Sequence, residues 1–346
     1  MNLLTRIATI LGFLRHFPAY TLAYLIETII VIMFGTVAVA GMVYLFRKYM
    51  ARVQIRVGPN RVGKFGILQV MADGLKLFQK ESIMPSGRDD LPYKMAPVIV
   101  FIGLMMGFIF IPYGPLAWFG DLTVTHSDVS LVILFALIAI MPIGETLSGI
   151  TSNNKYAMLG ALRGVAKDIS FEVPMMLSIL SVVIMASANV SNPLDINGIV
   201  QAQSIPFIIL EPLGFLIFFI SMVARASFPP FDMAESDSEL VTGNTTEYSG
   251  LRFGMFYLGL FGTIFLGSMI ISSIYLGGYN GPFVGDLGFI WLLVKTLVLV
   301  IISLTVWLTM PRARIDKLVT FGWKILLPLS FLQLVVAGFL TLGGIS

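Results

Sequence analysis

The stretch FIWLLVKTLVLVIISLTVWLTM, from Phe289 to Met310, has one charged residue, Lys295, in 22 positions. A helix needs about 20 consecutive apolar residues to cross a hydrocarbon core of about 30 Å. The stretch meets that length and is much longer than a buried strand. It therefore predicts a transmembrane helix.

Seven further windows of the same character recur along the chain. The eight predicted spans are approximately residues 20–45, 95–119, 129–149, 173–189, 207–223, 253–276, 289–310 and 323–342. The composition agrees, because 57% of the 346 residues are hydrophobic and 12% are charged, about half the charged share of a soluble domain. We expect an all-α membrane protein, a single polytopic domain of eight transmembrane helices. The absence of Cys excludes a disulfide scaffold.

Positive charge gathers in four of the segments between spans. Nineteen of the 22 Lys and Arg residues lie in or next to loops 46–94, 150–172, 224–252 and 311–322. The alternate loops, 120–128, 190–206 and 277–288, contain none. Because basic loops remain in the cytoplasm, these four loops are predicted to be cytoplasmic and both termini to lie outside. The net charge of +3 is too small to indicate a nucleic-acid partner.

The first cytoplasmic loop contains an amphipathic segment, Ile67 to Lys80. One helical face carries Leu68, Met71, Leu75 and Phe78, and the opposite face carries Gln69, Asp73, Lys76 and Lys80. This pattern predicts a helix that lies at the membrane interface. The alternative for any single basic residue of this loop is that it simply anchors the protein to lipid phosphates.

The third cytoplasmic loop is acidic although it lies on the basic side. It carries five carboxylates, Asp232, Glu235, Asp237, Glu239 and Glu247. If the chain after Pro230 is helical, three of them, Asp232, Glu235 and Glu239, share one face. Crowded, partly buried carboxylates have raised and coupled pKa values, which suits groups that hold protons. The alternative is a solvated acidic loop or a docking patch for a basic partner.

Charges within or beside the spans are few, and each is a candidate functional group. They are Glu27, Glu145, Glu172, Glu211 and Lys295. Two isolated histidines, His16 and His126, fit no metal-ligand spacing. The sequence has neither thiol ligands nor a phosphate- or dinucleotide-binding glycine motif. We therefore predict no metal site and no redox centre in this chain.

Four blocks in the cytoplasmic loops resemble a known family. They are RKYMARVQIRVGPNRVGKFGILQVMADGLKLFQKE (Arg47 to Glu81), SNNKYAMLGALRGVAKDISFEV (Ser152 to Val173), PFDMAESDSELVTGNTTEYSG (Pro230 to Gly250) and PRARIDKLVTFGWKILLPL (Pro311 to Leu329). The family is the quinone-chamber membrane subunit of respiratory complex I, called NADH dehydrogenase subunit 1 or the H subunit of NADH-quinone oxidoreductase. Similar chains occur in F420H2 dehydrogenases and ferredoxin-linked relatives, so the electron donor stays open.

The resemblance implies a function in a proton-pumping oxidoreductase of a prokaryotic cell membrane, with the mitochondrial inner membrane less favoured. Soluble partner subunits would carry the Fe–S clusters and flavin, quinone would be the substrate, and antiporter-like membrane subunits would move protons. The implied quinone-chamber residues are Gln54, Arg56, Asp73, Lys76, Arg225, Phe231, Arg312, Arg314 and Asp316. The implied charge-coupling residues are Asp232, Glu235, Asp237, Glu239, Glu247, Glu145 and Glu172.

Four positions depart from the family pattern. Phe46 stands where the family has a Glu before Arg-Lys, Phe228 replaces an Arg, Leu260 replaces a Glu, and Trp307 replaces an Arg. Arg225, three residues before Phe228, is a candidate substitute for the lost Arg. Two other functions remain open: an independent ion or solute transporter that uses the acidic cluster, and a scaffold that only docks soluble subunits.

Overall fold

The computed structural model describes residues 19–116, 120–121, 123–125, 127–281 and 284–343. The longer helices are α2 (Ala19–Val53), α3 (Gln69–Gln79), α4 (Asp90–Ile109), α5 (Ser130–Thr151), α6 (Lys155–Ala186), α9 (Pro212–Arg225), α11 (Gly250–Tyr275), α12 (Val284–Thr309) and α14 (Leu327–Leu342). The shorter ones are α7 (Ile196–Ala202), α8 (Phe207–Leu210), α10 (Asp237–Leu240) and α13 (Ile315–Phe321), with single turns at Lys64–Gly66, Gly243–Thr245 and Gly322–Leu326. Two-residue strands, β1 (Pro115–Leu116) and β2 (Gly120–Asp121), pair antiparallel.

Seven helical segments in the described part of the chain are long and apolar enough to cross a membrane. They are Tyr24–Val53, Asp90–Ile109, Ser130–Thr151, Lys155–Ala186, Gly250–Tyr275, Leu287–Thr309 and Ile315–Leu342. The last segment runs continuously from α13 through a π-helical turn into α14. The all-helical membrane class predicted from the sequence therefore holds, apart from the small β1–β2 pair.

The predicted span 207–223 is interrupted. Glu211 has φ −126° and ψ 59°, and it separates the short α8 from α9. Pro212 begins α9, where its missing N–H removes no helical hydrogen bond. Since α9 has 14 residues, it is shorter than the usual span.

Two other boundaries differ from the sequence prediction. Helix α4 ends at Ile109, ten residues early, because Pro112 and Pro115 cannot continue a helix and Gly114 adopts φ +76°. Helix α6 begins at Lys155, so most of the predicted second loop is helical. Asn154 caps this helix by accepting a hydrogen bond from the backbone N–H of Tyr156 at 2.9 Å.

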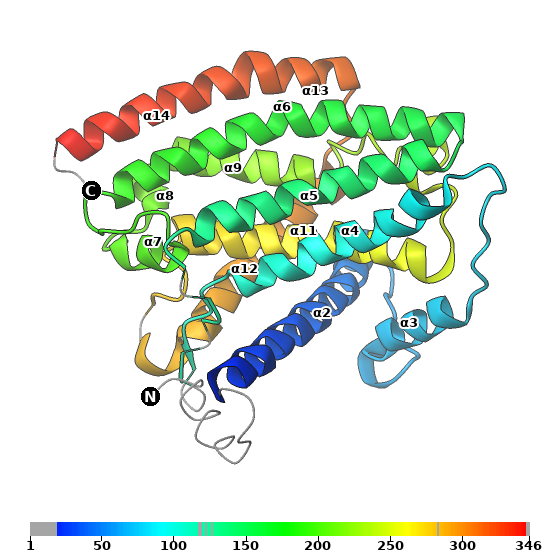
Figure 1. The fold of residues 1–346 in the computed structure, drawn as a ribbon, viewed down its shortest axis with the longest axis horizontal. Coiled ribbons are helices and arrows are strands. Elements are labelled where there is room, and N and C mark those ends of the chain that lie inside the picture. Colours follow the sequence, from blue (N-terminus) through cyan, green and yellow to red (C-terminus); the bar gives the residue numbers. More distant parts are fainter. Residues whose placement is uncertain (1–18, 117–119, 122, 126, 282–283, 344–346) are drawn as a thin grey trace.

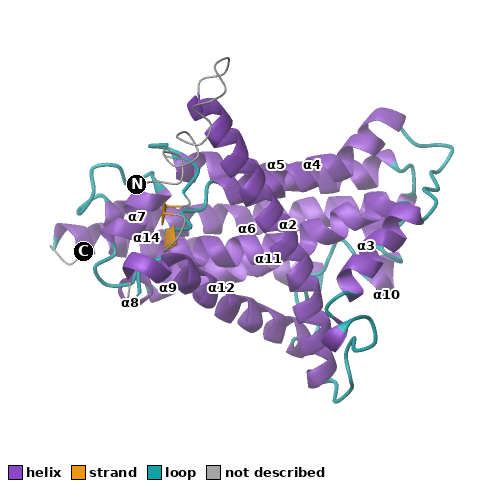
Figure 2. Ribbon diagram, turned by 90° about the horizontal axis from the view of Figure 1, so that it is seen from below, coloured by secondary structure: helices purple, strands orange, loops and turns teal. Residues whose placement is uncertain are grey.

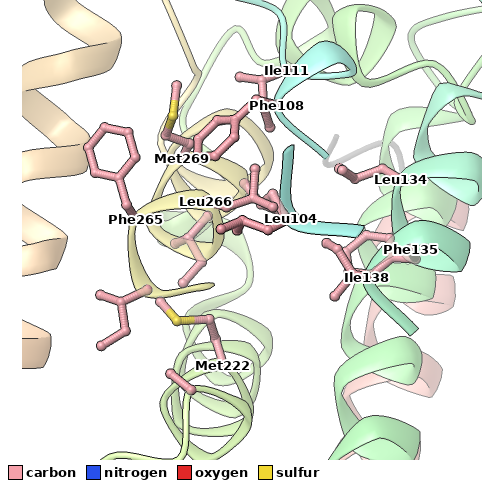
Figure 3. Packing of buried hydrophobic residues seen from close by; sticks show 14 of the residues in the cluster. Leu104, Phe108, Ile111, Leu134, Phe135, Ile138, Met222, Phe265, Leu266 and Met269 are labelled. Atoms are coloured by element: carbon pink, nitrogen blue, oxygen red, sulfur yellow. The ribbon is translucent and has the colours of Figure 1, made fainter. Parts of the chain in front are cut away.

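Helix α11 lies in the interior of the bundle, between α4, α9 and α12 (Figure 1). Its side chains Leu266 and Met269 pack with Leu104 and Phe108 of α4 (Figure 3). Helices α4 and α5 approach closely at Gly144, where an added Cβ would lie 2.8 Å from the carbonyl oxygen of Ala96. Small residues allow this approach, which compensates for the weak hydrophobic drive between helices in lipid.

The four predicted cytoplasmic loops meet at one end of the bundle. Backbone hydrogen bonds join Asp89 to Thr151 and Ala313 to Pro230, both at 3.1 Å. The backbone N–H of Ile83 donates to the Ser249 hydroxyl at 2.9 Å. Figure 2 shows α3 and α10 at this end and α7 and α8 at the opposite end. We call the first end the loop end.

One glycine controls the packing of the third loop. Gly243 has φ +55°, and a Cβ there would lie 1.6 Å from the carbonyl oxygen of Ala234. We predict that Gly243→Ala lowers the free energy of unfolding by at least about 2 kcal/mol, because both the backbone conformation and the contact would be lost.

Thermal unfolding of the protein in mild detergent checks this prediction. Gly74→Ala is the control, since no atom lies within 4 Å of a Cβ at that helical position. Equal thermal midpoints for the two variants would contradict the assigned role of Gly243.

Candidate functional site: a buried charge cluster at the loop end

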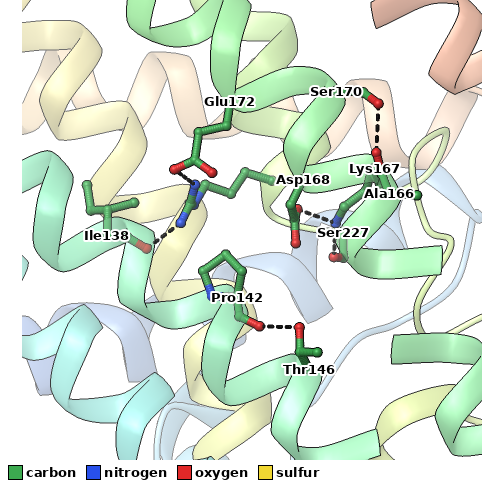
Figure 4. A network of polar contacts seen from close by, with 10 residues as sticks. Ile138, Pro142, Thr146, Ala166, Lys167, Asp168, Ser170, Glu172 and Ser227 are labelled. Carbon is green, nitrogen blue, oxygen red and sulfur yellow. Dashed lines mark hydrogen bonds and ion pairs between the residues drawn. The ribbon is translucent and has the colours of Figure 1, made fainter. Parts of the chain in front are cut away.

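Arg225 ends α9 inside the protein, with its side chain 7% exposed. One guanidinium nitrogen lies 3.3 Å from a carboxylate oxygen of Glu172, and another donates to the backbone carbonyl of Ile138 (Figure 4). That carbonyl is available because Pro142, four residues later, has no N–H to donate. A proline in α5 therefore creates an acceptor for a buried cation.

A second buried ion pair lies one turn earlier on α6. The ammonium of Lys167 is 3.3 Å from Asp168 and donates to the hydroxyl of Ser227 at 2.6 Å (Figure 4). The Lys167 and Asp168 side chains are 1% and 7% exposed. Buried charges of this kind are stable only when they are paired and hydrogen-bonded. The bond to Ser227 also joins α6 to the start of the third loop.

Two further carboxylates complete the charge cluster. The half-buried Glu145 and Glu235 line a small cavity of about 10 Å³ together with Arg225 and Asn244. The Asn244 amide donates to the backbone carbonyl of Glu145 at 3.5 Å, which holds the third loop against α5. We define the charge cluster as Glu145, Lys167, Asp168, Glu172, Arg225 and Glu235.

The outer carboxylates of the third loop have separate partners. Asp232 pairs with Arg312 of the fourth loop, and Glu239 lies 2.5 Å from Arg163 of α6. Glu247 accepts from the Asn154 amide at 2.7 Å. Cations and amides from other segments thus separate these acids from one another.

The condition for a shared helical face of Asp232, Glu235 and Glu239 is not met, because the only described helix in this segment is α10, from Asp237 to Leu240. Residues 231, 233, 234 and 236 are buried, and this spacing has no helical period. The loop is shaped by burial into the bundle. The side chain of Asp237, like His16 and His126, lies outside the described part of the chain.

The first-loop residues form a separate group beside α3. Arg47 of α2 pairs with Asp73, which also accepts from the Gln69 amide at 3.0 Å. Partial burial disfavours the charged form of Asp73, but these hydrogen bonds outweigh it and hold its pKa below the usual range. Lys76 is exposed.

The other predicted chamber residues fall in three separate segments. Gln54 is exposed and accepts from the Arg56 guanidinium at 2.7 Å. Arg314 and Asp316 are exposed at the start of α13. Phe231 is 8% exposed and packs edge-to-face on Phe171, with ring centroids 5.1 Å apart.

Three of the four departures from the family pattern form one aromatic stack. The Trp307 ring lies between Phe46 and Phe228, at centroid distances of 4.0 and 3.7 Å. Phe261 packs against all three rings. The fourth departure, Leu260, lines the small cavity beside Glu145. Positions where the resemblance implies charges are here filled by rings that pack on one another.

Sequence reasoning missed some buried charges and misjudged others. Lys167 and Asp168 lie in a segment that is predicted to be a loop, so their burial was not expected. Glu211, at an expected boundary, is fully buried and accepts from the Ser181 hydroxyl at 2.7 Å. Lys295 donates to three backbone carbonyls, those of Leu276, Gly278 and Asn280, at 2.6–2.9 Å. Lys295 therefore closes the turn after α11, a structural role.

These features define a class: a helical membrane protein with a cluster of buried charges where its loops meet at one end. Within the described ranges, no group of three or more His, Asp or Glu side chains is placed to hold a metal ion. The family model described as NADH dehydrogenase matches residues 26–338.

Three relatives, each named as the H subunit of NADH-quinone oxidoreductase, match nearly the whole chain. The protein of Dehalococcoides mccartyi is 38% identical over 94% of this chain and 88% of its own. The protein of Carboxydothermus hydrogenoformans is 39% identical over 86% of this chain and 83% of its own. The protein of Protochlamydia amoebophila is 38% identical over 88% of this chain and 93% of its own. The chain belongs to the NADH dehydrogenase family, which comprises the subunit 1 proteins and their H-type counterparts.

The aromatic stack yields a prediction about charge. Phe46→Glu alone is expected to lower the free energy of unfolding by about 3 kcal/mol, because a carboxylate would be buried without a cation. Adding Trp307→Arg should recover about 1 to 2 kcal/mol through their interaction. Thermal unfolding of single and double variants measures this coupling, with Phe46→Leu as the control for lost stacking. If the double variant is no more stable than the summed effects of the two single substitutions predict, the introduced carboxylate and guanidinium do not pair in the double variant.

The lowered pKa of Asp73 predicts a pH dependence. Because the folded pKa lies below the unfolded value of about 3.9, the Arg47–Asp73 pair stabilises the fold fully above that pH. Its contribution is lost as the pH falls through the folded pKa. The difference in thermal midpoint between the wild type and Asp73→Asn should therefore vanish at the acidic end. A difference that stayed constant from neutral pH to below about pH 3 would refute this.

Proposed function

We propose that this chain is the quinone-chamber membrane subunit of a complex I-type NADH-quinone oxidoreductase. The observation that carries this proposal is the charge cluster at the loop end of a chain in the NADH dehydrogenase family. In this role the chain couples reduction of quinone, held between its loops and soluble partner subunits, to proton translocation by antiporter-like membrane partners.

The proposed topology has eight crossings, and α8–α9 is the short one. Gln203 near α7 donates to the carbonyls of Ser273 and Ile274 at the end of α11. The third loop, after α9, lies beside the start of α11 at the opposite end of the bundle. The chain between these points returns through the bundle as α9, which supports an eighth crossing. Its break at the buried Glu211 is tolerable because protein, not lipid, surrounds it.

The proposed sidedness follows from charge. The loop end carries most of the Lys and Arg residues, so it would face the cytoplasm of a prokaryotic cell, with both termini outside. The exposed apolar side chains of α3, including Met71, Leu75 and Phe78, are 63–70% exposed. This supports a helix that lies at the membrane interface.

The proposed chemistry of this chain is movement of charge. The sequence has no Cys to ligate an Fe–S cluster, and the family resemblance assigns the Fe–S clusters and the flavin to soluble partner subunits. The electron donor, whether NADH, reduced F420 or ferredoxin, depends on those partners. The quinone-chamber candidates of the first and fourth loops, with Arg225 and Phe231, would border the path of the quinone headgroup.

Arg225 is the proposed centre of charge coupling. It contacts Glu172 directly and lines one cavity with Glu145 and Glu235. A negative charge that develops in the chamber changes which carboxylate the guanidinium compensates, and the carboxylate that is released then takes up a proton from solvent water. Asp232 and Glu247 are given a secondary role, because each is already bound by a residue that does not line the cavity. Asp237 remains a candidate by position alone.

This mechanism ranks the carboxylates. We predict that Glu145→Gln and Glu235→Gln each reduce quinone reductase and proton pumping at least about tenfold, since both face the buried cavity. Glu239→Gln should change either rate less than about twofold, because this side chain is 57% exposed and salt-bridged at the surface. Rates of the assembled complex in proteoliposomes provide the measurement. Equal effects of all three substitutions would argue against a buried centre of coupling.

Purification in mild detergent tests the proposed function itself. We expect soluble Fe–S subunits and antiporter-like membrane subunits to co-purify, and their identity names the electron donor. A lone protein that moves ions in liposomes would establish an independent transporter instead. If quinone reduction and proton pumping remain intact after the third-loop carboxylates are removed, the chain serves only as a scaffold that docks soluble subunits.

A further inference from the structure

A groove separate from the charge cluster lies between α2 and α12, beneath the segment that follows α2. Its volume is about 640 Å³, and it opens to the surface. The side chains that line it come from one face of α2, from Ile301 of α12, and from the turn around Arg56 and Phe65. The groove is large enough for part of a lipid molecule.

Three cations line the upper part of this groove. Lys48 and Arg52 are one helical turn apart on α2, and Arg56 follows in the next turn of chain. Among the residues that the structure describes, none of the three forms an ion pair. Arg47, by contrast, pairs with Asp73 toward α3. Three uncompensated positive charges at one end of a span attract an anion.

Two tyrosines hold the walls of the groove in place. The Tyr44 hydroxyl donates to the backbone carbonyl of Phe65 at 2.8 Å, which holds the loop over α2. The Tyr49 hydroxyl lies 2.8 Å from that of Thr305 on α12. Leu45 and Ile301 provide an apolar floor below the cations. The groove is therefore charged at the loop end and apolar toward the membrane interior.

Gly41 leaves space at the apolar end of the groove. It lies on the groove face of α2, and a Cβ there would have no atom within 4 Å. Glycine is unfavourable inside a helix, and the buried helical glycines Gly103 and Gly144 are explained by a neighbour under 3 Å away. Gly41 has no such neighbour within the described part of the protein, a property that it shares with Gly74 and Gly338, but it lines the groove and they do not. Because glycine has no side chain, the apolar end of the groove is extended there and has space for a hydrocarbon chain.

We propose that this groove binds an anionic phospholipid, with its phosphate between Lys48 and Arg52 and one acyl chain along Gly41. A neutral quinone headgroup would leave the three cations uncompensated. A free phosphate ion would leave the apolar floor exposed. The bound lipid fixes the first loop against α2 and α12. Of the three cations, Arg56 is also a quinone-chamber candidate, whereas Lys48 and Arg52, which hold the phosphate, are not.

Lipid binding to the detergent-purified complex tests the proposal. Native mass spectrometry compares retention of phosphatidylglycerol with that of phosphatidylcholine. The wild type should retain phosphatidylglycerol preferentially. Lys48→Gln/Arg52→Gln should weaken its retention at least about tenfold, since each basic residue near anionic lipid adds to the attraction. The matched control is Lys80→Gln/Lys317→Gln, which removes two exposed cations outside the groove.

A second pair of variants tests the apolar end. Gly41→Leu fills the groove and should reduce retention of phosphatidylglycerol, whereas Gly338→Leu, at an equally open helical position, should not. This pair decides the matter even if the double cation variant fails to assemble. If inorganic phosphate displaces the bound phosphatidylglycerol completely and Gly41→Leu has no effect, the groove is a simple anion site. If a short-chain quinone displaces the lipid, the groove is a quinone site. Either result, or equal retention of both lipids, overturns the proposal.

Discussion

A buried cation needs compensation in a low-dielectric interior, and the loop end of this protein is organised around that need at Arg225. The guanidinium pairs with a carboxylate of α6 and donates to a backbone carbonyl of α5. That carbonyl has no helical donor, because Pro142 lacks an N–H. Three helices are thereby fixed to one another at the point where α9 ends. The third loop starts at the next residue, so its path into the bundle depends on this contact.

The conformation of the third loop is then determined by its contacts within the bundle more than by the local conformational preferences of its residues. Ser227 binds Lys167, Asn244 holds Glu145, and Gly243 allows close contact with Ala234. Each contact joins the loop to α5 or α6, or to itself. Asp232, Glu239 and Glu247 each have a partner from another segment, whereas Glu235 lines the small interior cavity. The carboxylates of this loop therefore differ in the groups that surround them, a property that their spacing in the sequence does not contain.

Hydrophobic length and charge asymmetry allowed most of the fold to be predicted. The long helices, the amphipathic α3 and the grouping of the four loops follow from these two properties, because both act locally along the chain. The burial of Glu211, and that of Lys167 with Asp168, could not be predicted, since burial depends on contacts between segments far apart in sequence. The aromatic stack illustrates the same limit: Phe46, Phe228 and Trp307 are separate substitutions in the sequence, and only the fold brings their rings together.

The basic first loop and acidic third loop would attract one another if charge alone arranged them. The contacts are different: the third-loop acids Asp232 and Glu239 take Arg312 and Arg163, cations of the fourth loop and α6. The first loop has its own acid, Asp73, which pairs with Arg47 and holds α3 beside α2. Lys48 and Arg52, on another face of α2, form no ion pair within the described part of the chain and face a groove that is open at the surface. Cations that the protein does not pair from within attract anions from its surroundings, and beside a membrane span the phosphates of lipid headgroups are the nearest such anions, which is the basis of the proposed lipid site.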